Sequence, residues 1–316
     1  MKTSRFILLL QMALIVGCES MVTNISPSKL PKAGSKLVVQ SFISPQAEYI
    51  NVLVTESLPL FHRSNASVES IEDATVKISD DAHEAIVPFN ETTKTYTLPA
   101  DKFTILAGGT YHLEVSHGVR VVKAQCKVPG VTPVINSYEI SPLEARHHKL
   151  DGIELVQLNM NWKDTPGEKN YYRTNAYMTI EHSVGDGFVN GKETEKRMTS
   201  RLGFYWDRHS VNKELQQDQD LDGTTFFSPP GQLAMPTPRT YSDGVESQVK
   251  PKPTLKSITI ELFNTDENYF KYHHSLDERE DNANPFTEPY LIFTNIEGGL
   301  GCFGAYNAGK LVYQPE

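Results

Sequence analysis

Short runs of alternating apolar and polar residues recur along the chain from Leu37 onward, and they constrain the fold more than any other feature. Turn-forming residues separate the runs, which is the pattern of a β-sandwich rather than of alternating strands and helices. In the first part of the chain the runs cover residues 37–43, 49–55, 74–79, 84–89, 95–98, 110–116 and 119–128. Their number and spacing predict an immunoglobulin-like β-sandwich over residues 37–130.

Two local details support this sandwich. Tyr111 follows a pair of glycines at the start of the run 110–116, where immunoglobulin-like domains place their tyrosine corner. His117-Gly118 then predicts a tight hairpin turn, because glycine adopts positive φ without steric cost.

A second β-rich domain carrying one short helix is predicted over residues 136–316. Pro129-Gly130 marks the boundary, because a proline nitrogen cannot donate to a strand ladder. We expect strands at 153–162, 171–182, 255–263 and 290–294, and a helix at 266–280 with Thr265 or Asp266 as N-cap. Residues 183–254 form a long polar insertion with few expected strands. The predicted fold class is therefore mainly β.

The N-terminus has the features of a bacterial lipoprotein signal peptide. Basic residues precede an apolar stretch too short to span a bilayer, and residues 14–18 are Leu-Ile-Val-Gly-Cys. This ending resembles the lipobox, whose cysteine is lipidated and becomes the mature N-terminus. We expect removal of residues 1–17, a lipid anchor on Cys18 and an extended tether over 18–36. The alternative is a signal peptide that ends in Gly-Cys by chance, and the membrane leaflet stays open.

Charge and hydropathy exclude two classes of protein. Asp and Glu number 39 against 30 Lys and Arg, a formal net charge of -9, so the chain lacks the positive field that gathers nucleic acid. The mean hydropathy is -0.39 and the long apolar run lies in the leader, which excludes a protein with several membrane-spanning helices. The expected membrane contact is therefore the N-terminal lipid.

The C-terminal residues carry the most specific resemblance to a known family. Residues 284–289 are Asn-Pro-Phe-Thr-Glu-Pro, and residues 294–306 are Thr-Asn-Ile-Glu-Gly-Gly-Leu-Gly-Cys-Phe-Gly-Ala-Tyr. With segments at 37–40, 74–80, 109–111, 162–164 and 170–172, the chain resembles the domain-of-unknown-function 4249 family of Bacteroidota lipoproteins. The resemblance implies a cell-envelope lipoprotein with an N-terminal β-sandwich, commonly encoded beside TonB-dependent outer-membrane receptors. It implies no established activity and no catalytic residues, and the sequence departs from the family at Cys302, where an aliphatic residue is expected.

Asp218, Asp220 and Asp222 form the candidate metal site. With Gly223 they have the D-x-D-x-D-G spacing that wraps carboxylates around a hard cation. The twelfth loop position is Pro229 rather than glutamate, which excludes an EF-hand. A looser calcium loop and a solvated acidic turn both stay open.

Other cofactor-binding and catalytic motifs are incomplete in this sequence or lack the structural context that their chemistry requires. Residues 299–304 match G-x-G-x-x-G, but nucleotide binding needs a helix after the glycines and an acidic residue about twenty positions later, and the chain ends before that. We expect a glycine-rich turn there instead, where the backbone passes close to neighbouring strands. The sequence contains neither G-x-S-x-G nor H-E-x-x-H. We therefore expect no nucleotide, no cofactor other than calcium, and no catalytic residue.

Arg201 and the tripeptide Phe204-Tyr205-Trp206 are candidates for contact with a ligand or partner, because arginine and aromatic residues dominate interface energies. The alternative is a strand whose alternate rings pack inward, and three consecutive rings cannot all lie on one face of a strand.

Cys126 and Cys302 are the cysteines left for a disulfide, which an oxidising envelope compartment permits. Cys126 also has a simpler interpretation, because it shares one face of the run 119–128 with three apolar residues and fits a small core position.

These observations predict a non-enzymatic, outer-membrane-anchored lipoprotein that works beside a TonB-dependent transporter, where it captures ligand or gates access. The alternative is a stand-alone surface module that binds glycans or peptides or mediates adhesion, and the third reading is an uncharacterised hydrolase. The sequence identifies neither the ligand nor the partner.

Overall fold

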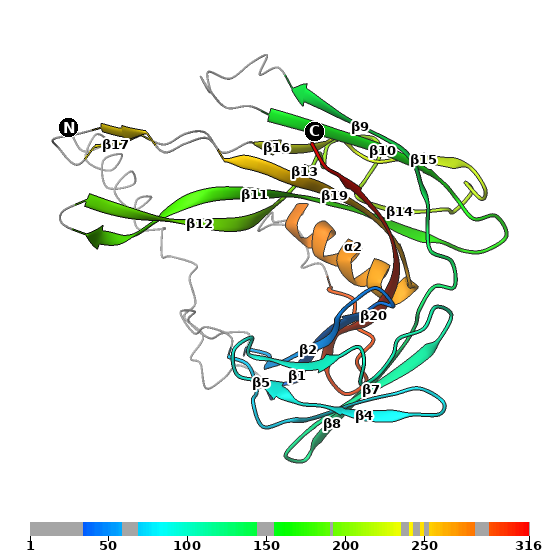
Figure 1. Ribbon diagram of the computed structural model, residues 1–316. Helices are drawn as coiled ribbons and strands as arrows, with labels where there is room; N and C mark the ends of the chain where they lie inside the picture. Colours follow the sequence, from blue (N-terminus) through cyan, green and yellow to red (C-terminus); the bar gives the residue numbers. More distant parts are fainter. Residues whose placement is uncertain are drawn as a thin grey trace, which may run out of the picture. The chain divides into compact units, whose positions relative to one another are not determined.

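The computed structural model describes residues 34–58, 69–143, 155–189, 192–234, 240–242, 247–249, 253–281 and 291–315 (Figure 1). The chain divides into two compact units, Met1–Ser35 with Leu58–Ser67, and Lys36–Ser57 with Val68–Glu316, and nearly all described residues belong to the second. The leader, Cys18 and most of the tether lie outside the described residues. No helix in the described ranges is long and apolar enough to cross a membrane.

Every predicted run between residues 37 and 128 contains a strand. The strands are β1 (Leu37–Ile43), β2 (Tyr49–Glu56), β3 (Thr75–Ser79), β4 (Glu84–Val87), β5 (Phe89–Asn90), β6 (Thr95–Pro99), β7 (Thr110–His117) and β8 (Arg120–Lys127). The run 84–89 forms two strands because Pro88, which has no N–H for a ladder, separates β4 from β5. Its carbonyl oxygen still accepts a hydrogen bond from the backbone of Thr97 (2.8 Å).

These strands form the predicted sandwich. One sheet has the order β4-β3-β7-β8, and β1, β2, β6 and β5 follow one another in the second. Alternate side chains of both sheets share one core, among them Val39, Val52, Val54, Val76, Ile78, Leu113, Val115 and Val122. Full burial of each such side chain is worth about 1.5–3 kcal/mol relative to exposure. The Tyr111 hydroxyl accepts a hydrogen bond from the Leu106 N–H (2.6 Å), which confirms the corner expected there.

A second pair of sheets encloses a separate core. Its strands are β9 (Ile135–Leu143), β10 (Leu155–Lys163), β11 (Tyr171–Val189), β12 (Lys192–Gly203), β13 (Tyr205–Trp206), β14 (Leu215–Gln217), β15 (Thr225–Phe227), β16 (Gly231–Ala234), β19 (Thr254–Thr265) and β20 (Leu300–Tyr313). Strands β17 (Thr240–Ser242) and β18 (Ser247–Val249) pair with each other in a separate two-stranded sheet. The order β13-β16-β10-β15, with β9 also on β10, makes one sheet, while β11 and β19 belong to the sheet opposite. Trp162 is fully buried between the two and stacks on Phe226 (ring centroids 5.8 Å apart).

Strand β20 joins the two sandwiches into one continuous sheet of order β12-β11-β19-β20-β1-β2-β6-β5. It runs antiparallel to β19 and parallel to β1, with Gly301 opposite Val39. The turn expected at 299–304 was wrong, because β20 begins at Leu300, but the backbone does pass close to a neighbouring strand as expected. Gly301 has φ +105, and a Cβ there would collide with the Val39 carbonyl oxygen, so the glycine lets two strands lie close together. Strands from both sides of the predicted domain boundary near residue 130 therefore belong to one sheet.

Helix α2 (Glu267–Asp281) forms where the sequence predicts it. Asp266 is its N-cap, since its Oδ1 accepts a hydrogen bond from the Tyr269 N–H (2.8 Å). Tyr269 and Phe270 face the sheet and share a small core with Tyr171 and Leu215. Figure 1 shows α2 beside β20, in agreement with their contacts.

Two expectations for the second half were wrong. The polar insertion 183–254 contains strands β12 to β18. These strands could not be predicted, because they are short or strongly polar and depend on their pairing with other strands. The strand expected at 290–294 does not form, because residues 291–296 have no regular structure and residue 290 lies outside the described ranges.

Candidate functional site

Three aspartates from two loops converge in the second sandwich. Asp164 directly follows β10, and Asp218 and Asp222 lie in the turn between β14 and β15. One carboxylate oxygen from each lies within 4.8 Å of the others. The loops meet because β10 pairs with β15 and β14 pairs with β11, which brings the ends of all four strands together.

The turn 218–223 has the backbone geometry that its D-x-D-x-D-G sequence favours. The Leu221 N–H donates to the Asp218 carbonyl oxygen (2.7 Å), and Asp220 and Gly223 have φ of 63° and 68°. Aspartate and glycine are among the residues that tolerate this left-handed conformation best. The turn thereby directs Asp218 inward and leaves Asp220 exposed.

Reciprocal hydrogen bonds hold the two loops together. The Gly223 N–H donates to Asp164 Oδ2 (2.7 Å), and the Gly167 N–H of the other loop donates to Asp222 Oδ1 (2.8 Å). Asp218 Oδ2 accepts a third bond from the Asn170 N–H (2.8 Å). Each aspartate therefore links its own loop to the other one.

The cluster is electrostatically costly without a compensating charge. Burial raises the pKa of Asp218, and the nearby carboxylates of Asp164 and Asp222 raise it further. The Tyr172 hydroxyl donates to Asp164 Oδ1 (2.7 Å), and burial together with this carboxylate raises the pKa of the phenol well above its usual range. A hard divalent cation would relieve the repulsion, and carboxylate and carbonyl oxygens are the ligands that calcium takes.

The structure revises the predicted metal set. It brings Asp218 and Asp222 together, as the spacing predicts, but Asp220 points to solvent and is not part of the group. Asp164 takes its place, and the sequence pattern missed it because it lies more than fifty positions before the turn. In the sequence, Asp164 is marked only by its position at the end of an amphipathic strand.

The residues predicted to contact a ligand or partner fall into two groups, one buried and one exposed. Phe204 and Trp206 are 8% and 6% exposed and pack in the core of the second sandwich, so neither ring is available to a partner. The Trp206 ring occupies the space over Gly231 that a side chain there would need. Tyr205 is 63% exposed, as strand alternation requires, and Arg201 is also exposed.

Arg201 belongs to a row of cations on one face of the sheet. In the β11–β12 ladder Arg201 pairs with Thr179, and Arg197 pairs with Ser183. Directly paired residues of antiparallel strands share a face, so both arginines lie on the same side. The Arg201 guanidinium lies 5.0 Å from the centre of the Tyr177 ring, which holds it in place.

Glu181 lies between the cations and binds two of them. Its Oε1 accepts from Arg197 Nη1 (2.9 Å) and its Oε2 from Lys256 Nζ (2.9 Å). Lys256 reaches this position from a β-bulge, because β11 pairs with Ser257 and Leu255 but skips the residue between them. The ion pair with Lys256, followed by that with Arg197, lowers the pKa of Glu181.

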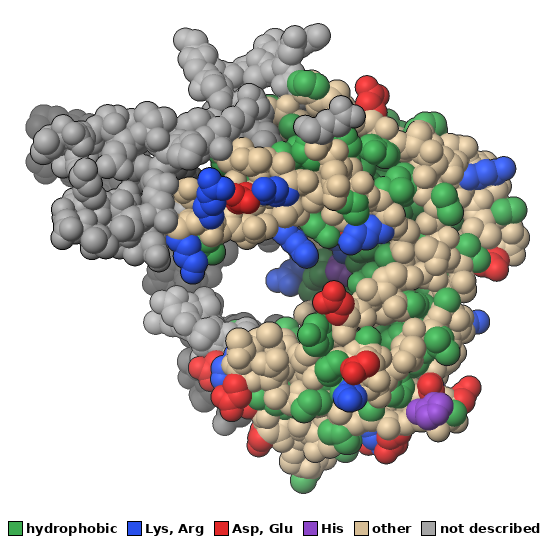
Figure 2. Space-filling view, in the orientation of Figure 1, with side chains coloured by type: hydrophobic (Ala, Val, Ile, Leu, Met, Phe, Trp, Pro, Cys, Tyr) green, Lys and Arg blue, Asp and Glu red, His purple; other side chains and the backbone are tan. Residues whose placement is uncertain are grey.

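We call the surface formed by Arg197, Arg201, Lys256, Glu181 and Thr179 the basic face. Figure 2 shows lysine and arginine side chains gathered over the part of the molecule where Figure 1 draws β11 and β12. The side chain of Arg197 is 81% exposed and that of Lys256 is 49% exposed.

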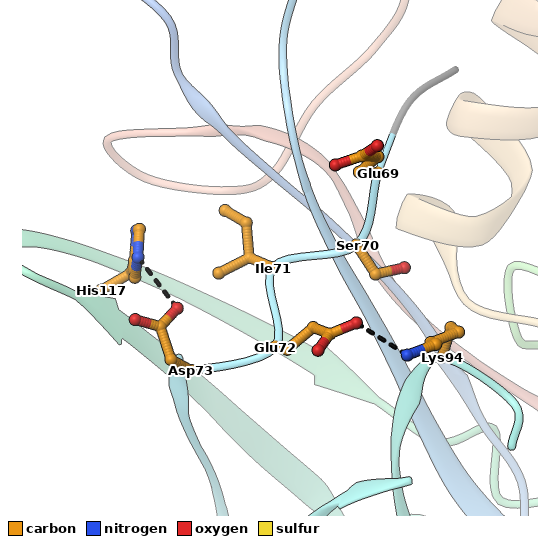
Figure 3. A pocket seen from close by; sticks show the side chains of 7 residues that line it. All are labelled: Glu69, Ser70, Ile71, Glu72, Asp73, Lys94 and His117. Carbon is orange, nitrogen blue, oxygen red and sulfur yellow. Dashed lines mark hydrogen bonds and ion pairs between the residues drawn. The ribbon is translucent and has the colours of Figure 1, made fainter. Parts of the chain in front are cut away.

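A pocket of about 860 Å³ lies in the first sandwich, lined by Glu69, Ser70, Ile71, Glu72, Asp73, Lys94 and His117. Figure 3 shows Asp73 directed toward His117 and Glu72 toward Lys94; the contact between Asp73 Oδ1 and His117 Nε2 is 3.1 Å long, and the ion pair between Glu72 and Lys94 is 2.8 Å long. The Tyr96 hydroxyl supports the lining segment by donating to the Ile71 carbonyl oxygen (2.9 Å). The lysine of this pocket is therefore already paired with a carboxylate.

The two remaining cysteines are free thiols in the structure, which does not form the bridge left open by the sequence. Both are buried, and burial raises the pKa of each well above its usual range. Asp266 contributes to both shifts, and Cys302 contributes to that of Cys126, so the groups lie near one another at the start of α2. Cys126 faces the first core, as expected for a small apolar residue.

Comparison with known proteins gives the family. No curated protein matches the chain. The model of the family described as domain of unknown function (DUF4249) matches residues 23–311, which is nearly the whole chain, and the chain belongs to that family.

Proposed function

We propose that this protein is a lipid-anchored, non-enzymatic protein of the outer membrane that captures ligand for a TonB-dependent transporter or gates access to it. The observation that carries the proposal is the Leu-Ile-Val-Gly-Cys sequence at residues 14–18, which follows a basic start and an apolar stretch. Acylation of Cys18 would keep the body at a membrane surface, because each buried methylene contributes about 0.8 kcal/mol.

The capture role is supported by the basic face. Its cations stand out from strands of a continuous sheet, and its guanidinium and ammonium groups are held by Tyr177 and Glu181. A surface whose charged groups are already positioned loses less conformational freedom when a ligand binds. Partnership with a transporter is supported by what the family resemblance implies.

Co-purification from membranes tests the partnership. Tagged protein is extracted in mild detergent from its own cells, captured, and analysed by mass spectrometry beside a Cys18→Ala variant. We expect an outer-membrane barrel of the TonB-dependent class with the wild-type protein, and a strong loss of it with Cys18→Ala, because the variant cannot be acylated. Capture of the wild-type protein without any such barrel would contradict the partnership.

The second candidate is a stand-alone surface module that binds glycans or peptides, and the basic face also favours this role. The co-purification separates the two candidates, because a stand-alone module binds its ligand with no barrel present.

A further inference from the structure

The charge of the basic face is opposite to that of the chain as a whole. The chain has a formal net charge of -9, yet Arg197, Arg201 and Lys256 surround Glu181 on one sheet face. A local field of opposite sign favours an anionic partner.

Besides Glu181, the side chains between the cations carry hydroxyl groups. Thr179 lies opposite both Arg201 on β12 and Ser257 on β19, and Glu181 lies opposite Thr199. Hydroxyl side chains both donate and accept hydrogen bonds, as sugar hydroxyls do. Guanidinium groups match the planar carboxylate, to which they donate two parallel hydrogen bonds.

From this arrangement we propose that the basic face binds an acidic oligosaccharide, a glycan whose sugar rings carry carboxylates. The proposal deepens the capture role and rests on it. Carboxylates bind Arg197, Arg201 and Lys256, and the sugar hydroxyls between them bind Thr179, Thr199 and Ser257.

A glycan fits this face better than an acidic peptide or a bilayer. Sheets recognise peptides mainly at an edge, where free backbone groups extend the ladder, whereas the proposed contacts here are side chains that stand on the face of β12, β11 and β19. A bilayer surface favours several large apolar side chains beside the cations, whereas here Thr179, Thr199 and Ser257 lie among the cations and the one large ring beside them, Tyr177, packs against Arg201.

Binding of the purified full chain to defined polymers tests the proposal. Fluorescently labelled oligogalacturonate is titrated with the protein, beside dextran of similar length, polyglutamate, and vesicles of phosphatidylglycerol in phosphatidylcholine. We expect binding of oligogalacturonate alone among these probes, weakened by added salt, because ion pairs contribute to it. The triple variant Arg197→Gln, Arg201→Gln, Lys256→Gln should bind at least about tenfold more weakly, since three charge-assisted contacts are lost.

The neighbouring Lys196 provides a matched control. It pairs with Val184, so its side chain lies on the opposite face of the same strand, and Lys196→Gln removes the same charge as Arg197→Gln. We expect Arg197→Gln to weaken binding several-fold and Lys196→Gln to change it less than about twofold. Melting curves of all variants confirm that they fold.

Several results would overturn the proposal. Equal effects of Arg197→Gln and Lys196→Gln would show general charge attraction, and equal binding of dextran would remove the role of the carboxylates. Equal binding of polyglutamate would identify a peptide surface, and binding of anionic vesicles alone would identify a membrane surface. Because only purified protein is used, a missing transporter partner does not affect the result.

Discussion

The backbone N–H of Gly223 donates a hydrogen bond to Asp164 Oδ2 (2.7 Å), and these two residues lie in loops that are distant in sequence. The contact places Asp164 beside Asp218 and Asp222 and creates an acidic cluster that neither loop could form alone. The cluster thus depends on the pairing of β10 with β15 as much as on the acidic turn itself.

Calcium is expected to raise the melting temperature if the cluster holds the ion. Binding to the folded state alone stabilises it by about 2.7 kcal/mol at a hundred times Kd. Asp164→Asn and Asp222→Asn should abolish the rise, because each removes a converging carboxylate. Asp220→Asn is the matched control in the same turn and should leave it unchanged. If millimolar calcium does not change the melting temperature of the wild type, the acidic turn is a solvated structural feature rather than a calcium site.

Gly301→Ala is expected to destabilise the protein by more than about 3 kcal/mol, because alanine is strained at φ +105 and its Cβ would collide with β1. Denaturant unfolding measures the change. Gly203→Ala, at a glycine with nothing within 4 Å of the added Cβ, should change the free energy of unfolding by less than about 1 kcal/mol. Equal effects of the two substitutions would argue against close packing of β20 on β1.

Asp266 is expected to make stability depend on pH. Burial raises its pKa from 3.8 to about 6, so the folded state favours the protonated form. Its stabilising contribution is therefore full below about pH 4 and is lost as the pH rises through 6. Relative to Asp266→Asn, which keeps an N-cap acceptor but cannot ionise, the wild type should lose up to about 3 kcal/mol across this window. Parallel pH profiles of the two proteins would contradict this assignment.

The thiols of Cys126 and Cys302 are expected to react slowly in the folded protein. Burial raises both pKa values, and the thiolate is the reactive form. Native protein should therefore react with iodoacetamide far more slowly than protein unfolded in guanidinium. The mass of unreduced protein after alkylation in denaturant supplies the control, because two alkyl groups on these residues indicate free thiols, whereas none indicates a bridge.

Strands with regular alternation could be predicted from the sequence. In the run 110–116 the apolar residues Tyr111, Leu113 and Val115 alternate with polar ones, and β7 has nearly the same bounds because this apolar face is buried. Strand β20 could not be predicted, because glycines at 299, 301 and 304 indicate a turn unless β1 is known to lie against them.

In the candidate sites, too, residues that meet only through strand pairing could not be predicted from the sequence. Asp218 and Asp222 follow from local spacing, whereas Asp164 joins them only through strand pairing. Lys256 likewise meets Glu181 because of a β-bulge, which is a property of two strands rather than of either sequence. The alternation argument did foresee that Phe204, Tyr205 and Trp206 cannot share one face, and Tyr205 is the exposed one.

The central claim, that this chain is a lipid-anchored protein of the cell envelope, is tested most directly by the intact mass of protein extracted from membranes. We predict a chain that begins at Cys18 and carries acyl groups, with a Cys18→Ala variant that lacks them and leaves the membrane fraction. An unacylated wild-type chain, or one that begins at another residue, would contradict the claim.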